Sequence, residues 1–316
     1  MNSKKTLTRD QNRNLFFGLM IIVPIVIFII FYGIVNFNTL SLAFKKYEPI
    51  EGQIGYKTSF AGFENFSVVF KMLSYQNNWR MVTNSLTLWF FKLVVGLSMS
   101  IIFSYYVYKK MFGSKFFRVI LFLPNVISNL IMVYLFRLVV NDAVVGLKIA
   151  EMGLLTNPET RFMTIVFFNL WLGFAGQTLM FTSAMSSINE STVEAAQIDG
   201  VNSINELFYI TIPMIFPTFT TFIILGIAEI FVDQMSLLTF YDEYQMPPSV
   251  RTVGYYLYQE ALRSDVVPTT AWLSNPDKGR LSYSELSAFS LMITLIIIPI
   301  SFALRKMFDN IDPMKD

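Results

Sequence analysis

The stretch Glu190–Pro213, ESTVEAAQIDGVNSINELFYITIP, lies between two long apolar segments and differs in composition from both. It has no lysine or arginine, and none occurs anywhere from residue 162 to residue 250. It has four acidic residues: Glu190, Glu194, Asp199 and Glu206. A charged loop between two apolar segments is typical of a polytopic membrane protein, and its one-signed charge makes it a candidate surface for a partner.

Two short helices and a turn are predicted inside this stretch. Ser191 and Glu194 have the spacing of a capping box, in which the hydroxyl and the carboxylate cap each other's backbone N–H groups. Ser203 and Glu206 repeat that spacing. Gly200 lies between the two boxes and can adopt the left-handed conformation that ends many helices. The expected order is a helix over 192–199, a turn, and a second helix over 203–213.

The composition places most of the chain in a membrane. Of 316 residues, 54% are hydrophobic and 15% are charged, whereas soluble domains have about 25% charged residues. The net charge of +2 argues against a nucleic-acid partner. Because the chain has no histidine and no cysteine, thiolate chemistry, histidine catalysis and disulfides are excluded. It also has no G-x-x-x-x-G-K-[ST] phosphate loop, so any ATP hydrolysis requires another subunit.

Six segments have the length and composition of transmembrane helices, which need about 20 mainly apolar residues. The first is longer than the apolar core of a signal peptide and is followed by no cleavage site, so we expect it to be retained. The predicted spans are 15–37, 85–107, 117–140, 162–185, 213–235 and 288–304.

Basic residues at the span ends orient the protein, because cytoplasmic loops are enriched in lysine and arginine. Three clusters lie on the same side of the predicted spans: Lys4, Lys5, Arg9 and Arg13; Lys109, Lys110, Lys115 and Arg118; Arg305 and Lys306. Both termini and the loop 186–213 are therefore predicted to be cytoplasmic. The long loops 38–84 and 236–287 are then outside, where an external protein can dock.

Glu194-Ala195-Ala196, Gly200, Ile210 and Pro213 match the E-A-A-x₃-G-x₉-I-x-L-P pattern of permeases of binding-protein-dependent ABC importers. Ile212 replaces the leucine. The Ile198-Asp199 pair before the glycine resembles the sugar and oligosaccharide branch, of the maltose-importer type. Outside the loop, FAGFENF (60–66) resembles the family's F-x-G-x-x-N-[FY] stretch, and TNSL (83–86) resembles the start of its second span.

The resemblance implies an all-α integral membrane protein with the type I importer permease fold. It implies a tail over 1–14, a six-span domain over 15–304 that includes the loop 186–213, and a tail over 305–316. It implies three kinds of partner beside lipid: a second permease, two ATPase subunits and an external substrate-binding protein. ATP and magnesium would bind to the ATPase subunits. This chain itself would bind no cofactor. The loop would couple ATPase closure to the spans through Glu190, Glu194, Ala195, Ala196, Asp199, Gly200, Ile210 and Pro213.

Polar residues inside the predicted spans are candidates for the substrate pathway, because such residues are costly in lipid and usually face a cavity. Glu229 and Asp233 are four residues apart and would share one helix face. Their carboxylates, with nearby amides, have the chemistry that binds sugar hydroxyls, and glycines would leave room for a ligand. Lys92, inside span two, is expected to snorkel or to pair with a carboxylate. The predicted pathway comprises Asn129, Asn169, Gly173, Gln177, Glu229 and Asp233.

Three alternatives remain open at this point. The first is an ABC permease for a non-sugar solute. The second is an ion-coupled carrier in which the carboxylates carry protons, although no internal repeat is found. The third is an intramembrane hydrolase that uses Glu229 and Asp233 as an acid–base pair. We expect the chain itself to perform transport rather than catalysis.

Overall fold

The computed structural model describes residues 9–50, 56–241, 246–262 and 280–313. Its residues cluster into two compact units, one of 1–72 with 265–292 and one of 73–264 with 293–316. The predicted tails lie partly outside the described residues, with Lys4 and Lys5 among those not described. Parts of the predicted outer loops, 51–55, 242–245 and 263–279, are also outside them.

The first unit begins with a long apolar helix and continues into a hairpin. The helix is built from α1 (Arg9–Phe28), the π-turn η1 (Ile29–Ile34) and α2 (Val35–Ala43). Strands β1 (Lys45–Pro49) and β2 (Tyr56–Phe60) pair antiparallel, with Lys45 opposite Phe60. The helix α3 (Glu64–Ser74) follows. This hairpin is the departure from an all-α fold among the described residues.

The stretch 60–66 connects the hairpin to α3 in this unit. Gly62 adopts a φ of +55° at the turn before α3. Asn65 is fully buried, and its Nδ2 donates to the backbone oxygens of Ala43 at 2.8 Å and Lys45 at 2.7 Å. The asparagine thus satisfies the carbonyls left open where α2 ends and fixes the start of the hairpin.

The second unit holds the remaining helices. Span two is continuous through a π-turn, and span four is one uninterrupted helix. The elements are α4 (Gln76–Phe91), η2 (Lys92–Gly96), α5 (Leu97–Tyr108), α6 (Ser114–Val126), α7 (Asn129–Arg137), η3 (Leu138–Ala143), α8 (Val144–Gly146), α9 (Arg161–Ser186), α10 (Glu190–Ile198), α11 (Ser203–Glu206), η4 (Leu207–Thr211), α12 (Ile212–Met214), α13 (Phe216–Ala228), α14 (Leu237–Phe240), η5 (Pro248–Val250), α15 (Val253–Leu262) and α17 (Tyr283–Ile311), which starts in the first unit.

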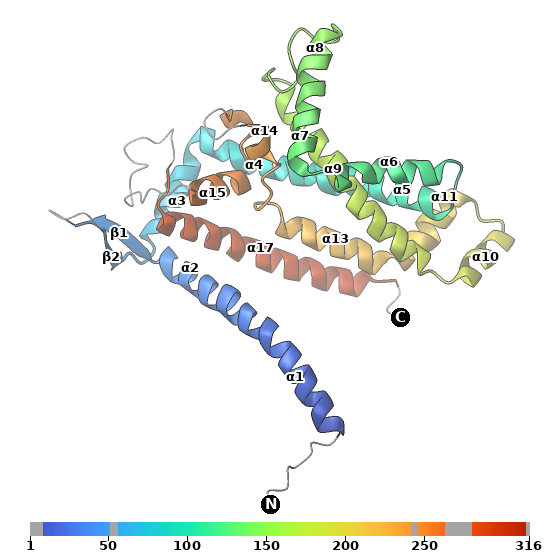
Figure 1. The fold of residues 1–316 in the computed structure, drawn as a ribbon, viewed down its shortest axis with the longest axis horizontal. Helices are drawn as coiled ribbons and strands as arrows, with labels where there is room; N and C mark the ends of the chain where they lie inside the picture. Colours follow the sequence, from blue (N-terminus) through green and yellow to red (C-terminus); the bar gives the residue numbers. More distant parts are fainter. Residues whose placement is uncertain (1–8, 51–55, 242–245, 263–279, 314–316) are drawn as a thin grey trace, which may run out of the picture. The chain divides into compact units, whose positions relative to one another are not determined.

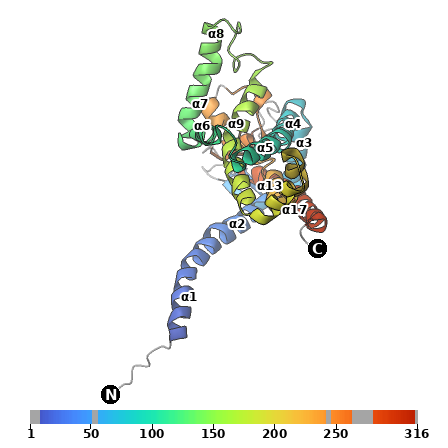
Figure 2. The ribbon, with the colours of Figure 1, turned by 90° about the vertical axis from the view of Figure 1, so that its right-hand side faces the viewer.

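The helices α5 and α9 form the centre of the second unit and lie side by side in both views (Figures 1 and 2). Ile101 and Phe181 are buried between them with Met185. The Ser104 hydroxyl lies 3.0 Å from the carbonyl oxygen of Thr178, so a polar contact also joins the two helices. Small and apolar residues therefore let α5 and α9 pack closely, as transmembrane helices do.

The number of spans agrees with the expectation, but their continuity does not. Within the described ranges five helices are long and apolar enough to cross a membrane, and a sixth is obtained if one bent pair counts as a single span. That pair, Ser203–Met214 and Phe216–Ala228, bends by 72°. Pro213 stands immediately before the bend, and Pro217 follows it at the start of α13.

The predicted span over 117–140 is not one continuous helix. The chain leaves helical geometry at Ile127 and Ser128, whose ψ angles are 142° and 135°. In both views α7 turns sharply away from the direction of α6 (Figures 1 and 2). Pro124 cannot donate within α6, and Ser128 starts the next helix. The span is therefore divided into two helices at residues 127 and 128.

The prediction that the fifth span continues to residue 235 is also wrong. The helix α13 ends at Ala228, and Glu229 is its C-terminal cap. The chain then turns through residues with positive φ, Met235 at +52° and Ser236 at +54°. Glu229 and Asp233 consequently do not lie on one face of a continuous helix.

The segment 229–236 is held in place by the N-terminus of α15. The Thr252 hydroxyl donates to the backbone oxygen of Asp233 at 3.0 Å. Asn84 donates to the carbonyls of Ser249 and Arg251, both at 2.9 Å, and the Ser85 hydroxyl accepts from the N–H of Val253 at 3.0 Å. The TNSL stretch at the start of span two thus fixes residues 249–253 by hydrogen bonds from Asn84 and to Ser85.

Replacing Gly254 with alanine is expected to destabilise the second unit by about 1–3 kcal/mol. A Cβ at this position would lie 2.4 Å from the carbonyl oxygen of Val232 and 2.7 Å from that of Asp233. Both contacts are backbone atoms, so no side chain can rotate away. The melting temperature of the detergent-purified chain measures the effect. Gly146→Ala, where an added Cβ meets nothing within 4 Å, is the matched control, and equal melting temperatures for the two variants would contradict the prediction.

Candidate functional site: a two-helix loop and a cavity between spans

The first helix of the loop, α10, starts two residues earlier than a Ser191 cap would allow. Its N-cap is Asn189, whose side chain accepts from the N–H of Ser191 at 3.2 Å. Asparagine is as good an N-cap as serine, and here it precedes the serine in the chain. The capping box predicted for Ser191 and Glu194 is therefore wrong, although the predicted helix is present.

The turn at Gly200 is confirmed. Gly200 has a φ of +76°, its N–H donates to the carbonyl of Gln197 at 3.1 Å, and the N–H of Val201 donates to that of Ala196 at 3.0 Å. This pair of bonds is a Schellman motif, which closes a helix on a left-handed residue. The local sequence thus fixes the angle at which the chain leaves α10.

The second helix of the loop begins after Asn202, which caps it by accepting from the N–H of Asn205 at 2.8 Å. The predicted capping role of Glu206 is wrong, because this side chain is only 3% exposed and pairs with Lys109 instead. The Lys109 Nζ lies 2.7 Å from Glu206 Oε2. Lys109 caps the end of α5, so one of the four loop carboxylates connects the loop to span two.

The remaining acidic residues give the loop its outward charge. Glu190, Glu194 and Asp199 are exposed, while Val193 and Ala196 of α10 are buried. Ala195 is exposed and Ile198 is 86% exposed. The outward face of α10 therefore combines carboxylates with small and apolar side chains, and α10 lies at the end of the second unit away from α14 and α15 (Figure 1).

The other two loop residues of the sequence motif serve the connection rather than this face. Ile210 lies in the π-turn η4 and is partly buried. Pro213 stands in α12, where the 72° bend into α13 begins. They join the loop to span five.

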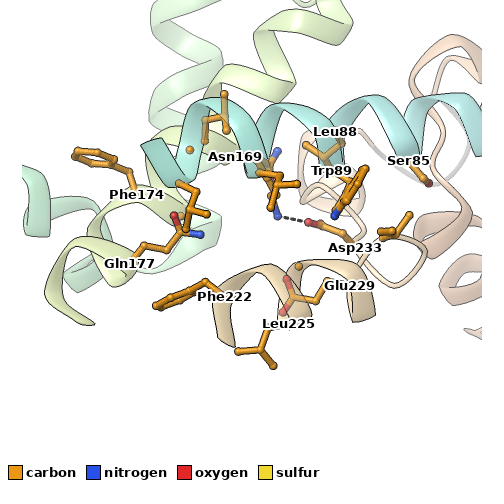
Figure 3. A pocket seen from close by; sticks show the side chains of 18 residues that line it. Ser85, Leu88, Trp89, Asn169, Phe174, Gln177, Phe222, Leu225, Glu229 and Asp233 are labelled. Carbon is orange, nitrogen blue, oxygen red and sulfur yellow. Dashed lines mark hydrogen bonds and ion pairs between the residues drawn. The ribbon is translucent and has the colours of Figure 1, made fainter. Parts of the chain in front are cut away.

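A cavity of about 250 Å³ lies between spans two, four and five. Figure 3 shows Gln177, Glu229 and Asp233 directed toward it from different elements, with Trp89 on the wall formed by α4. Five of the six predicted pathway residues line it: Asn169, Gly173, Gln177, Glu229 and Asp233. A Cβ added at Gly173 would meet nothing within 4 Å, which confirms that this glycine leaves open space.

An ion pair crosses the cavity between Lys92 of η2 and Asp233 (Figure 3). The expectation that Lys92 pairs with a carboxylate is confirmed. The second oxygen of Asp233, Oδ1, accepts from the N–H of Met235 at 2.8 Å. Asp233 therefore neutralises the cation and also holds the left-handed turn after α13.

The other polar groups of the cavity differ in how they are held. Gln177 Oε1 accepts from the Ser100 hydroxyl at 2.9 Å, and Asn169 Nδ2 donates to the carbonyls of Ile165 at 2.8 Å and Met235 at 3.1 Å. Glu229 is exposed and forms no ion pair within the described part of the chain. Its carboxylate is free to accept hydrogen bonds from a ligand's hydroxyl groups.

Asn129, the sixth predicted pathway residue, is not in the cavity wall. It is exposed at the start of α7, and its Nδ2 lies 3.3 Å from the Ser236 hydroxyl. The structure instead adds a wall from span two that the sequence reasoning missed, Ser85, Trp89 and Gly96 around Lys92. Their spacing of four, three and four residues is that of one helix face, and this signal would have found them.

The chain resembles known transport proteins over most of its length. The family described as "Binding-protein-dependent transport system inner membrane component" matches residues 92–315. The sn-glycerol-3-phosphate transport system permease protein UgpA of Shigella dysenteriae is 26% identical over 213 residues, covering 65% of this chain and 71% of UgpA. The multiple sugar-binding transport system permease protein MsmF of Streptococcus mutans is 24% identical, with coverages of 66% and 71%.

A solved structure shares the fold. It belongs to a bacterial ABC transporter involved in the import of the acidic polysaccharide alginate, with a TM-score of 0.72 at 20% identity over 96% of this chain and 98% of that one. A second solved structure with the same TM-score is that of a bacterial alginate ABC transporter in complex with an alginate pentasaccharide-bound periplasmic protein. With a family match over more than half of its residues, this chain belongs to the inner-membrane components of binding-protein-dependent transport systems.

Proposed function

We propose that the chain is the permease subunit of an ATP-driven importer for a sugar or oligosaccharide. The observation that carries the proposal is the cavity between spans two, four and five, in which carboxylate, amide and indole groups face one space. Carboxylates and amides accept and donate hydrogen bonds to hydroxyl groups, and an aromatic face packs against a sugar ring. The relative MsmF, which is named for multiple sugars, and the fold shared with an alginate importer support this substrate class.

Energy would enter through the loop 186–213. Its acidic, partly apolar face suits a basic cleft on a cytoplasmic ATPase subunit, with two such subunits in the complex. Closure of the ATPase dimer would move α10, and the Pro213 bend would pass this movement to α13, which borders the cavity. Under this proposal the loop and both termini are cytoplasmic in a bacterial plasma membrane, and the chain has no catalytic residue.

The same proposal assigns the other partners. A single chain supplies one side of a pathway, so a second permease, homologous but different, would supply the other. A substrate-binding protein would dock on the outer segments 38–84 and 236–287, and the solved complex of the alginate transporter with its periplasmic protein supports that expectation. Because the cavity wall has two carboxylates and one ammonium group, we expect neutral sugars to be accepted at least as well as uronates.

Affinity purification of the tagged chain from its native membranes, followed by mass spectrometry, tests the assembly. The expected result is an ATPase subunit with a phosphate loop and a second six-span protein in stoichiometric amounts. Uptake by proteoliposomes of the purified complex then tests the substrate, with radiolabelled neutral and uronate-containing oligosaccharides, amino acids and phosphate. Uptake should need internal ATP and the binding protein and should survive an ionophore.

Two outcomes would contradict the proposal. A chain that purifies alone and transports without ATP, driven by an ion gradient, would favour the carrier alternative. ATP-dependent uptake of amino acids or phosphate with no sugar uptake would support an ATP-driven importer but contradict a sugar as its substrate.

A further inference from the structure

A second cavity, of about 460 Å³, lies at the link between α5 and α6. Three of its wall residues are basic, Lys110, Lys115 and Arg118, and none is acidic. All three are exposed, and in the part of the chain that the structure describes none of them forms an ion pair. By contrast, Lys109 of the same link pairs with Glu206. Three uncompensated cations around one hollow form a site for an anion.

The cavity lies at the end of a candidate membrane span. The link follows directly on the apolar helix Asn78–Tyr108, one of the candidate spans. The Lys109–Glu206 pair places it at the same end of the second unit as the loop with α10 and α11, as Figure 1 also shows. Phe112, between the basic residues, is fully exposed. An exposed aromatic ring beside cations is typical of a surface that meets lipid headgroups.

An apolar groove adjoins the basic cavity. It has a volume of about 340 Å³ and is lined by Ile102, Phe103, Tyr106 and Phe117, from α5 and α6. The rings of Tyr106 and Phe117 meet edge to face, with centroids 5.9 Å apart. The Tyr106 hydroxyl donates to the carbonyl of Phe112, a residue of the basic cavity's wall. Tyr106 thus joins the floor of the groove to the basic cavity.

Basic residues at a cytoplasmic link also serve to orient a membrane protein. Orientation, however, does not require a cavity between these residues or an apolar groove beside it. We propose that the basic cavity and the groove together bind one anionic phospholipid, its phosphate among Lys110, Lys115 and Arg118 and an acyl chain along the groove. The site is separate from the sugar cavity and lies next to the coupling loop, so the bound lipid would brace the α5–α6 link, where Lys109 meets the loop.

Native mass spectrometry of the full chain, titrated with phosphatidylglycerol in detergent, tests the site. The variant Lys115→Gln/Arg118→Gln should bind phosphatidylglycerol about 30-fold more weakly, since each basic residue near an anionic lipid surface contributes on the order of a fivefold change. The matched control is Arg305→Gln/Lys306→Gln, which removes the same charge from exposed positions at the end of α17. It should keep wild-type affinity.

A second variant tests the groove without altering charge. Ile102→Trp fills the groove from a half-exposed position and should weaken binding of phosphatidylglycerol but not of inorganic phosphate. Phosphatidylcholine should bind at least tenfold more weakly than phosphatidylglycerol to the wild-type chain.

Three results would overturn the proposal. Equal losses in the control and in the Lys115/Arg118 variant would reduce the site to general charge attraction. If Ile102→Trp binds phosphatidylglycerol with wild-type affinity, and inorganic phosphate binds as tightly as the lipid, the cavity binds phosphate alone and the groove holds no acyl chain. Loss of lipid binding when the purified ATPase is added would assign the hollow to a protein partner.

Discussion

Gly200→Asp is expected to reduce ATP-driven uptake by more than about tenfold while the chain stays folded. At a φ of +76° a side chain costs about 1–2 kcal/mol, and it meets nothing within 4 Å, so the fold survives. The new carboxylate stands at the C-terminal end of α10, where the helix dipole disfavours negative charge. Both effects disturb the Schellman turn that aims α10 at its partner.

Uptake by proteoliposomes and the melting temperature of the complex are the two measurements. Gly200→Asn is the matched control for charge, because asparagine and aspartate enter the left-handed conformation alike and asparagine carries no charge. We expect it to keep most of the uptake. If Gly200→Asp transports as fast as the wild type, the loop has no coupling role.

Asp233→Asn is expected to destabilise the chain by about 1–3 kcal/mol and to reduce uptake at least about tenfold. Asparagine can still accept from the N–H of Met235, so the turn after α13 is kept. The change leaves Lys92 without its counter-charge inside a span, where an unpaired cation is costly. Both side chains are partly exposed, 32% for Lys92 and 20% for Asp233, which keeps the cost below that of a fully buried pair.

A double-mutant cycle with Lys92→Met separates stability from transport. The double variant Lys92→Met/Asp233→Asn should recover most of the melting temperature because no unpaired charge remains. Its uptake should stay low, because the cavity has then lost two groups that bind a polyhydroxylated ligand. Wild-type uptake by the double variant would show that the pair only joins span two to the segment after span five.

The coupling loop illustrates how far local sequence reaches. Gly200 and the helix before it were predictable because a left-handed C-terminal residue and its two backbone bonds involve only near neighbours. The helix starts were predicted less well, because both asparagine and serine can cap a helix. In each helix the asparagine that precedes the serine in the chain is the N-cap, Asn189 in the first and Asn202 in the second. The role of Glu206 was not predictable at all, since its partner Lys109 is 97 residues away.

The cavity shows the same division. Hydrophobicity located the apolar segments, and five of the six residues chosen for the cost of polar groups in lipid line this cavity. The face of span two was overlooked, although its spacing was visible around Lys92. Asn129 lies outside the cavity wall, because the chain leaves helical geometry at residues 127 and 128 and α7 starts a new helix there.

The sequence by itself determined that this chain crosses the membrane repeatedly, that a charged two-helix loop with a glycine turn interrupts the spans, and that its family is one of import permeases. Each of these depends on composition or on contacts between near neighbours. Only the tertiary structure decided where spans three and five break, that Lys92 meets Asp233 across 141 residues, and that Glu206 turns inward. Those outcomes depend on which distant helices pack together, because a charge or a carbonyl in a span must find its partner wherever the packing brings one.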